Sequence, residues 1–271
     1  MELEEANRIE DIQHPSVREC LLHLGFHNDR IVVQHGADLP AMAGIGSSSA
    51  FTVGLLHALH AYRGETVARP QLAQEAIYVE QKRIGENVGY QDQAAVAVGG
   101  LNRIEFYQDE GIGWKRLRLA KTTVQALEDR LLMIFTGRAR VASDIAAAQI
   151  KITPQKEQEL HQMKEMVYEA EKILSGGESR LWEFGKLLHE SWMLKRGLTQ
   201  EISNSVIDSM YAAAREEGAL GGKILGAGGG GFLLLFAEPE HHERIKARLI
   251  NYPAISFKFE RNSGSAVIYR D

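Results

Sequence analysis

The sequence is poor in cysteine, proline and long apolar runs, and it has no excess of basic residues. Its single cysteine, Cys20, excludes a disulfide framework and a cysteine-rich zinc site. The formal net charge of −5 lacks the basic signature of a nucleic-acid-binding protein. The longest apolar runs, such as 232–237, are too short to span a bilayer, and the acidic N-terminus has no apolar signal-peptide core. We therefore expect a cytoplasmic protein with neither a membrane nor a nucleic-acid partner.

The 271 residues suffice for two modest domains, and their pattern predicts an α+β fold. We place the domain boundary between residues 1–120 and 121–271. The expected helices cover 14–24, 51–62, 70–84, 155–175, 179–195, 200–217 and 238–250. The expected strands cover 31–35, 94–106, 114–119, 131–137, 221–225, 232–237, 255–260 and 265–270.

A loop rich in glycine and serine, PAMAGIGSSSA at 40–50, leads directly into a predicted helix. Glycines let the backbone approach a ligand closely, and the free amide groups at the start of a helix favour an anion. No lysine follows the glycines, so the loop is not a Walker-type P-loop. It is either a phosphate loop or a tight turn with a serine cap. The candidate phosphate-binding residues are Gly44, Ile45, Gly46, Ser47, Ser48 and Ser49.

A second glycine loop, LGAGGGGF at 225–232, lies between two apolar runs that are typical of strands. Four consecutive glycines weaken a strand interior, and a hairpin turn needs only one or two. A ligand that approaches the backbone closely would account for them, and a flexible hairpin tip is the alternative.

Two carboxylates are the candidates for phosphoryl-transfer chemistry. Glu80 lies on a largely apolar face of a predicted helix, where an unpaired charge is costly, so it either binds a metal or lies at the solvated edge. Asp92 lies in a predicted loop just before a predicted strand, where it either caps a turn or handles a proton.

Together the two glycine loops resemble the second and third motifs of the GHMP kinase superfamily. The segments ENVGYQDQAAVAVGGLNRIEF and LLMIFTGRARVASDI resemble its sugar-kinase branch, in particular the D-glycero-D-manno-heptose 7-phosphate kinases. The family's first motif, R-x-P-x-R followed by a glycine-rich segment, is absent from the sequence. We expect a fragment, a shortened chain or a degenerate member of the family.

The resemblance implies an N-terminal ribosomal-protein-S5-like domain and a C-terminal ferredoxin-like domain, with an ATP site at their cleft. It also implies an ATP- and Mg²⁺-dependent kinase that acts on the anomeric hydroxyl of a heptose 7-phosphate. Two alternatives remain, a kinase of a fucose- or galactose-type sugar and a non-catalytic relative that only binds nucleotide. A homodimer is also left open. The implied roles are catalytic base for Asp92, Mg²⁺ binding for Ser48 and Glu80, and substrate binding for Arg140, Gly228, Gly229 and Gly230.

Overall fold

The computed structural model describes residues 3–27, 29–39, 44–109, 111–138, 142–260 and 264–269. The chain divides into two compact units. Unit 1 comprises Met1–Ala41, Gly46–Lys115 and Glu260–Asp271, and unit 2 comprises Met42–Ile45 and Arg116–Phe259. The sequence-based division between 120 and 121 stays a prediction, and the grouping adds that the closing segment belongs with unit 1. Within the described ranges no helix is long and apolar enough to span a membrane.

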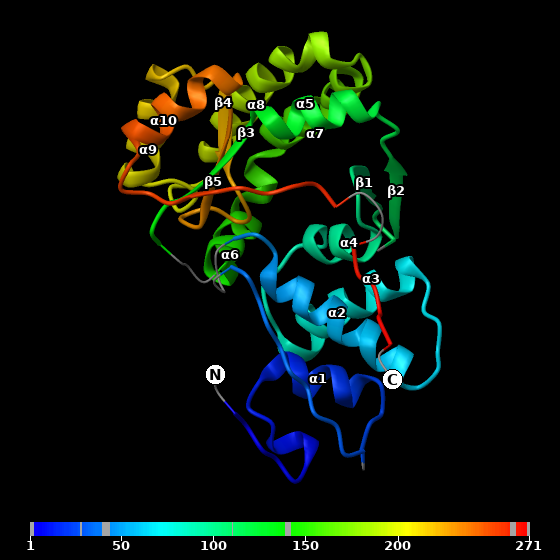
Figure 1. Cartoon of the computed structure of the whole chain (residues 1–271). Coiled ribbons are helices and arrows are strands. Elements are labelled where there is room, and N and C mark those ends of the chain that lie inside the picture. The colour runs from blue at the N-terminus through cyan, green and yellow to red at the C-terminus, as the bar shows by residue number, and fades with distance from the viewer. Residues whose placement is uncertain are drawn as a thin grey trace. The chain divides into compact units, whose positions relative to one another are not determined.

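Unit 1 is a cluster of helices with one β-hairpin (Figure 1). The helix α2 begins after Gly46 and ends before Gly64, whose φ of +72° is typical of a glycine just beyond a helix. Buried side chains of α1, α2 and α3, such as Cys20, Leu56 and Leu72, form its core. The elements are η1 (Ile9–Asp11), α1 (Pro15–His23), α2 (Ser47–Tyr62), α3 (Arg69–Tyr78), the π-helix η2 (Val79–Ile84), α4 (Gln91–Val98), β1 (Asn102–Phe106) and β2 (Ile112–Arg116).

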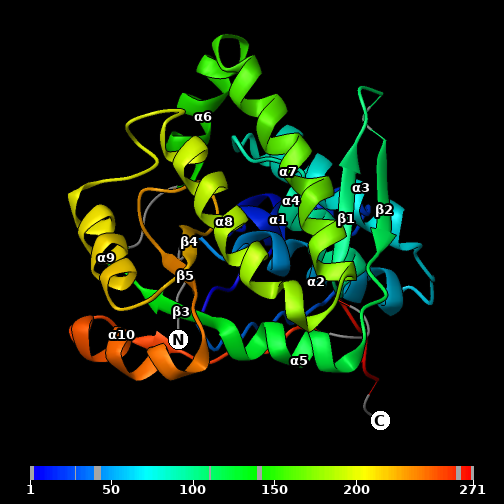
Figure 2. The ribbon, with the colours of Figure 1, turned by 90° about the horizontal axis from the view of Figure 1, so that it is seen from above.

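Unit 2 is built on a four-stranded sheet in the order β4-β5-β3-β6, in which every pairing is antiparallel. Trp192 and Ile207 are buried in its larger core, while α7 and α8 run beside each other (Figure 2). The elements are α5 (Lys121–Arg130), β3 (Leu131–Phe135), α6 (Ala142–Ile152), η3 (Thr153–Gln155), α7 (Glu157–Ser175), η4 (Glu178–Arg180), α8 (Leu181–Arg196), α9 (Ser205–Glu216), β4 (Gly221–Ile224), β5 (Phe232–Phe236), η5 (Pro239–His241), α10 (His242–Arg248) and β6 (Ala254–Ile255).

Several sequence-based predictions of strands are wrong. Residues 94–98 of the predicted strand 94–106 lie in the helix α4, because their alanines favour a helix more strongly than their two valines favour a strand, and only the part at β1 is a strand. No strand forms over 31–35, and of the two predicted closing strands only the short β6 appears in the described residues. The helices α5 and α6 were not predicted. The α+β class is confirmed.

Candidate active site

The loop before α2 ends in a glycine with a left-handed backbone. Gly46 has φ +73° and precedes the first turn of α2, and no side chain of the described residues caps that turn. The amide groups of Ser47, Ser48 and Ser49 form this first turn, so the helix offers its positive end to an anion. Glycine is needed at 46 for a second reason, since a Cβ there would lie 3.1 Å from Oδ2 of Asp92.

Asp92 lies in the first turn of α4 and not in a loop before a strand, which corrects the sequence-based interpretation. A carboxylate in the first turn of a helix is stabilised by the helix dipole. The close approach of Gly46 puts the Asp92 side chain directly beside the start of α2. The structure therefore brings the predicted base and the Gly46–Ser49 part of the predicted phosphate loop together inside unit 1.

Glu80 is held in the π-helix η2 with only 1% of its surface exposed. One of its oxygens, Oε2, accepts a hydrogen bond from Ser49 Oγ at 3.0 Å and a second from Gln93 Nε2. The other oxygen, Oε1, is buried and has no hydrogen-bond partner among the described residues. A π-helical turn is rare and frequently lies at a functional site.

Burial raises the pKa of the Glu80 carboxyl, because the ionised form loses its hydration. The polar groups of Thr52, Gln93 and Ser49 act in the opposite direction, although the Thr52 hydroxyl lies outside hydrogen-bonding geometry. Among nearby charges, that of Glu86 raises the pKa further. A cation beside Oε1 would offset both the burial and the repulsion.

The buried oxygens around Glu80 fit a hard cation such as Mg²⁺. Three of them have no hydrogen-bond partner among the described residues, namely Thr52 Oγ1, Glu80 Oε1 and Gln93 Oε1. Mg²⁺ prefers oxygen ligands of this kind and commonly takes only one or two carboxylates, with water and substrate phosphates completing the shell. The residues present are therefore compatible with the metal that the family resemblance implies.

The serine that contacts Glu80 is Ser49 and not Ser48, which the resemblance selected. Ser49 is buried and donates to the carboxylate, whereas Ser48 is exposed. Neighbouring residues of an α-helix point about 100° apart around its axis, so the two hydroxyls face different surroundings. The pairing of Ser48 with Glu80 in one metal site is not seen in the structure.

The second glycine loop connects β4 to β5 within unit 2 and is tightly packed. A Cβ on Gly228 would lie 2.7 Å from the Ile202 carbonyl oxygen, and one on Gly230 would lie 2.8 Å from that of Arg138. Gly229 donates its N–H to the Ile202 carbonyl at 2.8 Å and accepts from Asn204 Nδ2 at 3.1 Å. The loop is thus not a flexible hairpin tip, and its buried glycines contact other parts of the protein backbone.

Gly44 groups with unit 2 and contacts the second glycine loop there. A Cβ on Gly44 would lie 3.1 Å from the Leu225 carbonyl oxygen, and one on Gly226 would lie 2.7 Å from the Gly44 carbonyl oxygen. The Gly226 carbonyl oxygen also accepts a hydrogen bond from Lys195 Nζ at 2.6 Å. Gly44 of the first loop therefore lies against Leu225 and Gly226 of the second loop.

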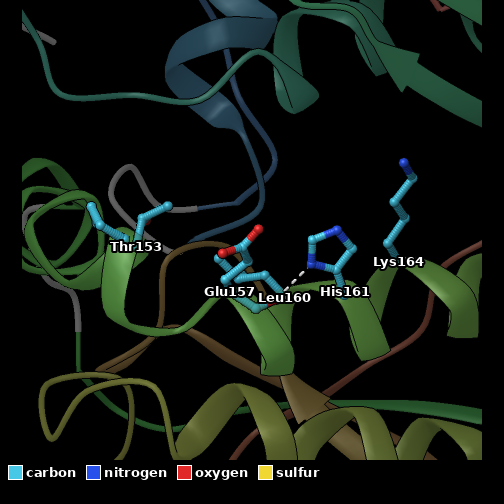
Figure 3. A pocket seen from close by; sticks show the side chains of 6 residues that line it. Thr153, Glu157, Leu160, His161 and Lys164 are labelled. Carbon is cyan, nitrogen blue, oxygen red and sulfur yellow. Dashed lines mark hydrogen bonds between the residues drawn. The ribbon is translucent and has the colours of Figure 1, made fainter.

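Arg140 lies outside the described residues, and neither of two pockets found in the described part of the chain is lined by a predicted site residue. One pocket, of about 340 Å³, lies on unit 2 and is lined by Thr153, Pro154, Glu157, Leu160, His161 and Lys164 (Figure 3). The other, of about 350 Å³, lies on unit 1 and is lined by Gln74, Ile77, Tyr78, Gln81, Lys82, Tyr90, Asp109 and Gly111.

The sequence predicted Ser49 as a phosphate-binding residue but not as a neighbour of Glu80, and it gave no role to Thr52 or Gln93. The signals were present, because Ser49 and Thr52 are three residues apart and share a helix face, and Gln93 directly follows Asp92. The sequence does not show that α4 approaches η2. The hydrogen bond between Gln93 and Glu80 depends on this approach, because the two residues are far apart in the sequence.

Comparison with known proteins identifies the family of the chain. Residues 16–100 match the GHMP kinases N terminal domain and residues 170–254 match the GHMP kinases C terminal region. The chain is 30% identical to the D-glycero-alpha-D-manno-heptose 7-phosphate kinase of Campylobacter jejuni, over 78% of this chain and 62% of that protein. It is 27% identical to the bifunctional fucokinase/GDP-fucose pyrophosphorylase of Arabidopsis thaliana, over 89% of this chain and 24% of that protein. The chain thus spans less than two thirds of the length of these relatives.

Solved structures show the same fold. A D-glycero-D-manno-heptose 1-phosphate kinase of Bacteroides thetaiotaomicron is 22% identical, with a TM-score of 0.75 over 100% of this chain and 78% of that chain. The galactokinase of Lactococcus lactis complexed with galactose is 17% identical, with a TM-score of 0.65 over 98% of this chain and 78% of that chain. On its sequence motifs, its two matching domains and its fold, the chain belongs to the GHMP kinase superfamily.

Proposed function

We propose that the protein is a sugar kinase that transfers the γ-phosphoryl group of ATP to the anomeric hydroxyl of D-glycero-D-manno-heptose 7-phosphate. The product would be the 1,7-bisphosphate, a precursor of nucleotide-activated heptose. The observation that carries the proposal is the meeting of three short segments in unit 1. The start of α2 contacts Asp92, and Gln93, the next residue, contacts Glu80.

Asp92 is the proposed catalytic base. Its carboxylate would accept the proton of the anomeric hydroxyl as the sugar oxygen bonds to phosphorus and the bond to the ADP oxygen breaks. Its place beside Gly46 supports this role, because the phosphate groups are proposed to lie at the adjacent helix terminus. Phosphoryl transfer depends mainly on positioning and charge stabilisation, which short, rigid helix ends provide.

The proposed phosphate-binding residues are Gly44 to Ser49, whose amides and hydroxyls would donate to phosphate oxygens. Glu80 is the proposed carboxylate ligand of Mg²⁺, and Ser48 remains the serine that the family resemblance assigns to the same ion. When bound, Mg²⁺ would neutralise negative charge on the phosphate oxygens. Ser49 would hold the Glu80 carboxylate in place through its hydrogen bond.

The acceptor is proposed from the similarity to heptose phosphate kinases, and fucose- or galactose-type sugars are the alternative. Arg140, Gly228, Gly229 and Gly230 are the proposed substrate contacts. For Gly228 and Gly230 this proposal competes with a structural role, since both are buried against protein backbone. Gly226 is the exposed glycine of that loop and a further candidate.

A substrate panel tests the proposal directly. Purified protein with ATP and Mg²⁺ is offered heptose 7-phosphate, unphosphorylated heptose, fucose, galactose and mevalonate, and ADP release is measured. We expect heptose 7-phosphate to be preferred, and ³¹P NMR should locate the new phosphate on the anomeric carbon. Asp92→Asn should lower turnover by roughly 10²–10⁴-fold, whereas Asp129→Asn, on the exposed face of α5, should not lower it. Nucleotide binding without transfer to any acceptor would favour the non-catalytic alternative.

A further inference from the structure

The two oxygens of the Glu80 carboxylate have different surroundings. Oε2 accepts two hydrogen bonds, from Ser49 Oγ and from Gln93 Nε2, whereas Oε1 has no partner among the described residues. Both oxygens are buried, since the residue is 1% exposed. An ionised carboxylate offers about four lone pairs, and a buried oxygen that accepts nothing is costly. The asymmetry therefore needs a physical reason.

The donors to Oε2 come from two different helices. Ser49 lies in the first turn of α2 and Gln93 in the first turn of α4, and these helices pack against each other in unit 1. Two donors on one oxygen fix the rotation of the carboxylate about its terminal bond. Glu80 Oε1 is then held in one direction. Residues that support a metal ligand orient it in this way.

The remaining unpartnered groups near this carboxylate are oxygens whose lone pairs could bind a cation. Thr52 Oγ1 and Gln93 Oε1 are buried, with Thr52 at 0% and Gln93 at 1% exposure, and neither has a partner among the described residues. Neither the Gln93 carbonyl oxygen nor Glu80 Oε1 carries a proton in the ionised site. Such an environment suits a cation and disfavours an anion or an apolar group.

We propose that Gln93 is a positioning residue for the divalent cation of the kinase, a step that rests on the proposed function. Its Nε2 donates to Glu80 Oε2 and so directs Glu80 Oε1 to the ion. Because Gln93 directly follows Asp92 on α4, the same helix turn orders both the carboxylate ligand and the proposed base. A displacement of α4 would thus disturb cation binding and proton transfer together.

Mn²⁺, which has the same ligand preference as Mg²⁺ and an EPR signal, is the probe. The free Mn²⁺ signal is titrated with the full chain, once alone and once with a non-hydrolysable ATP analogue. Loss of a residue that orients a metal ligand typically weakens metal affinity by about 10–100-fold. We expect Gln93→Met, which keeps the length but loses the amide, to weaken Mn²⁺ binding by this factor.

Four controls separate positioning from a general structural role. Gln91→Met, an exposed neighbour on the same helix turn, should leave Mn²⁺ affinity within twofold of wild type. The affinity of Gln93→Met for ADP in EDTA should also stay within twofold. If Gln93→Met does not fold, Gln93→Asn retains the amide on a side chain too short to reach, and the same loss is expected. Ser49→Ala and Gln93→Met should be non-additive, because both donate to one oxygen.

The outcomes distinguish this inference from the proposed function. Unchanged Mn²⁺ affinity in folded Gln93→Met or Gln93→Asn, with wild-type binding intact, overturns the inference and leaves the kinase proposal standing. Equal losses of Mn²⁺ and metal-free ADP affinity would show a structural role and also overturn it. If the wild type binds the nucleotide but no Mn²⁺ under either condition, the metal assignment fails and the inference fails with it.

Discussion

The two glycine loops of this chain look alike in sequence but serve different physical ends. At the first loop, Gly46 brings the start of α2 against the Asp92 side chain, and no side chain of the described residues caps that helix. In the second loop, Gly228 and Gly230 are buried against backbone carbonyls of the same unit. The start of α2 after the first loop is not capped by a side chain of the described residues, whereas the second loop hydrogen-bonds to neighbouring segments of unit 2.

The comparison shows what a glycine run indicates. It predicts that something approaches the backbone closely, but it does not tell whether that is a ligand or another segment of the protein. Whether the neighbouring polar groups already have partners in the protein distinguishes a ligand site from internal packing. Around Glu80 three buried oxygens have no partner in the described part of the chain, while the carbonyls at 226, 227 and 229 accept from Lys195, Gln149 and Asn204.

The largest expected effect is on catalysis at the first loop. Asp92→Asn should lower kcat by roughly 10²–10⁴-fold. The substitution keeps the shape of the side chain but removes the carboxylate that is proposed to take the proton of the sugar hydroxyl. ATP affinity should stay within about twofold, since an interaction made only in the transition state lowers kcat and kcat/KM together. The measurement is steady-state kinetics with a separate nucleotide titration. A loss of less than about tenfold, or recovery of kcat in excess Mg²⁺, would contradict the base assignment.

The second expected effect is on stability at the second loop. Gly228 has φ +116° and its Cβ would overlap the Ile202 carbonyl, so Gly228→Ala combines backbone strain with a steric conflict. Gly137 is the matched control, because its φ is +75° and no atom lies within 4 Å of its Cβ position. Gly137→Ala should cost about 1–2 kcal/mol from strain alone. Gly228→Ala should cost about 1–3 kcal/mol more, the usual range for overpacking.

Urea unfolding of both variants measures this difference. If Gly228→Ala and Gly137→Ala are equally stable and only Gly228→Ala loses sugar affinity, the second loop is a ligand site and the contrast between the loops fails. If Gly228→Ala loses stability while residual folded protein binds sugar normally, the loop is structural at this position.

How much of this could be predicted from the sequence depends on the range of the contacts. The α+β class and both loops came from local patterns, because glycine, serine and apolar periodicity act over a few residues. The segment at 91–98 was misread, since its mixture of alanine and valine supports either a helix or a strand. The contacts of Glu80 with Ser49 and Gln93 join residues 31 and 13 positions apart, and no local pattern specifies them.

A smaller effect sharpens the choice between two adjacent serines. Ser49→Ala should raise the Mg²⁺ concentration needed for half activation by about two- to tenfold, the usual net value of one hydrogen bond, because the Glu80 carboxylate loses one donor. Ser48→Ala tests the family assignment, which predicts weaker Mg²⁺-ATP binding with little change in metal-free ADP binding. Both variants are compared by nucleotide titration with Mg²⁺ and in EDTA. If Ser48→Ala weakens both titrations equally, its role lies in the helix start and not in metal binding.

The smallest expected effect concerns His60, a second buried titratable group of unit 1, which has carboxylate partners in the same unit. The ring of His60 bonds to Glu65 through Nδ1 at 2.8 Å and to Glu75 through Nε2 at 2.7 Å. Burial alone would lower the pKa of His60, but the hydrogen bonds and charges of the two carboxylates outweigh it and raise the pKa. These carboxylates favour the protonated, cationic ring of His60, whereas among the described residues no ion pair of Glu80 is seen.

The raised pKa of His60 makes stability depend on pH in a definite direction. Because the folded protein holds this proton more tightly than the unfolded chain, the contribution is complete below the ordinary pKa of 6.5 and is lost as the pH rises through the raised value. His57, three residues earlier on α2, is the matched control, since burial lowers its pKa and protonation below pH 6.5 should therefore destabilise the fold.

Melting temperatures of wild type, His60→Gln and His57→Gln between pH 5 and pH 9 should show opposite changes. Between pH 6.5 and pH 9 the stability advantage of wild type over His60→Gln should shrink, and below pH 6.5 the advantage of wild type over His57→Gln should shrink as the pH falls. An advantage over His60→Gln that is constant with pH would mean that the imidazole is neutral and that unit 1 has no internal cation at these carboxylates.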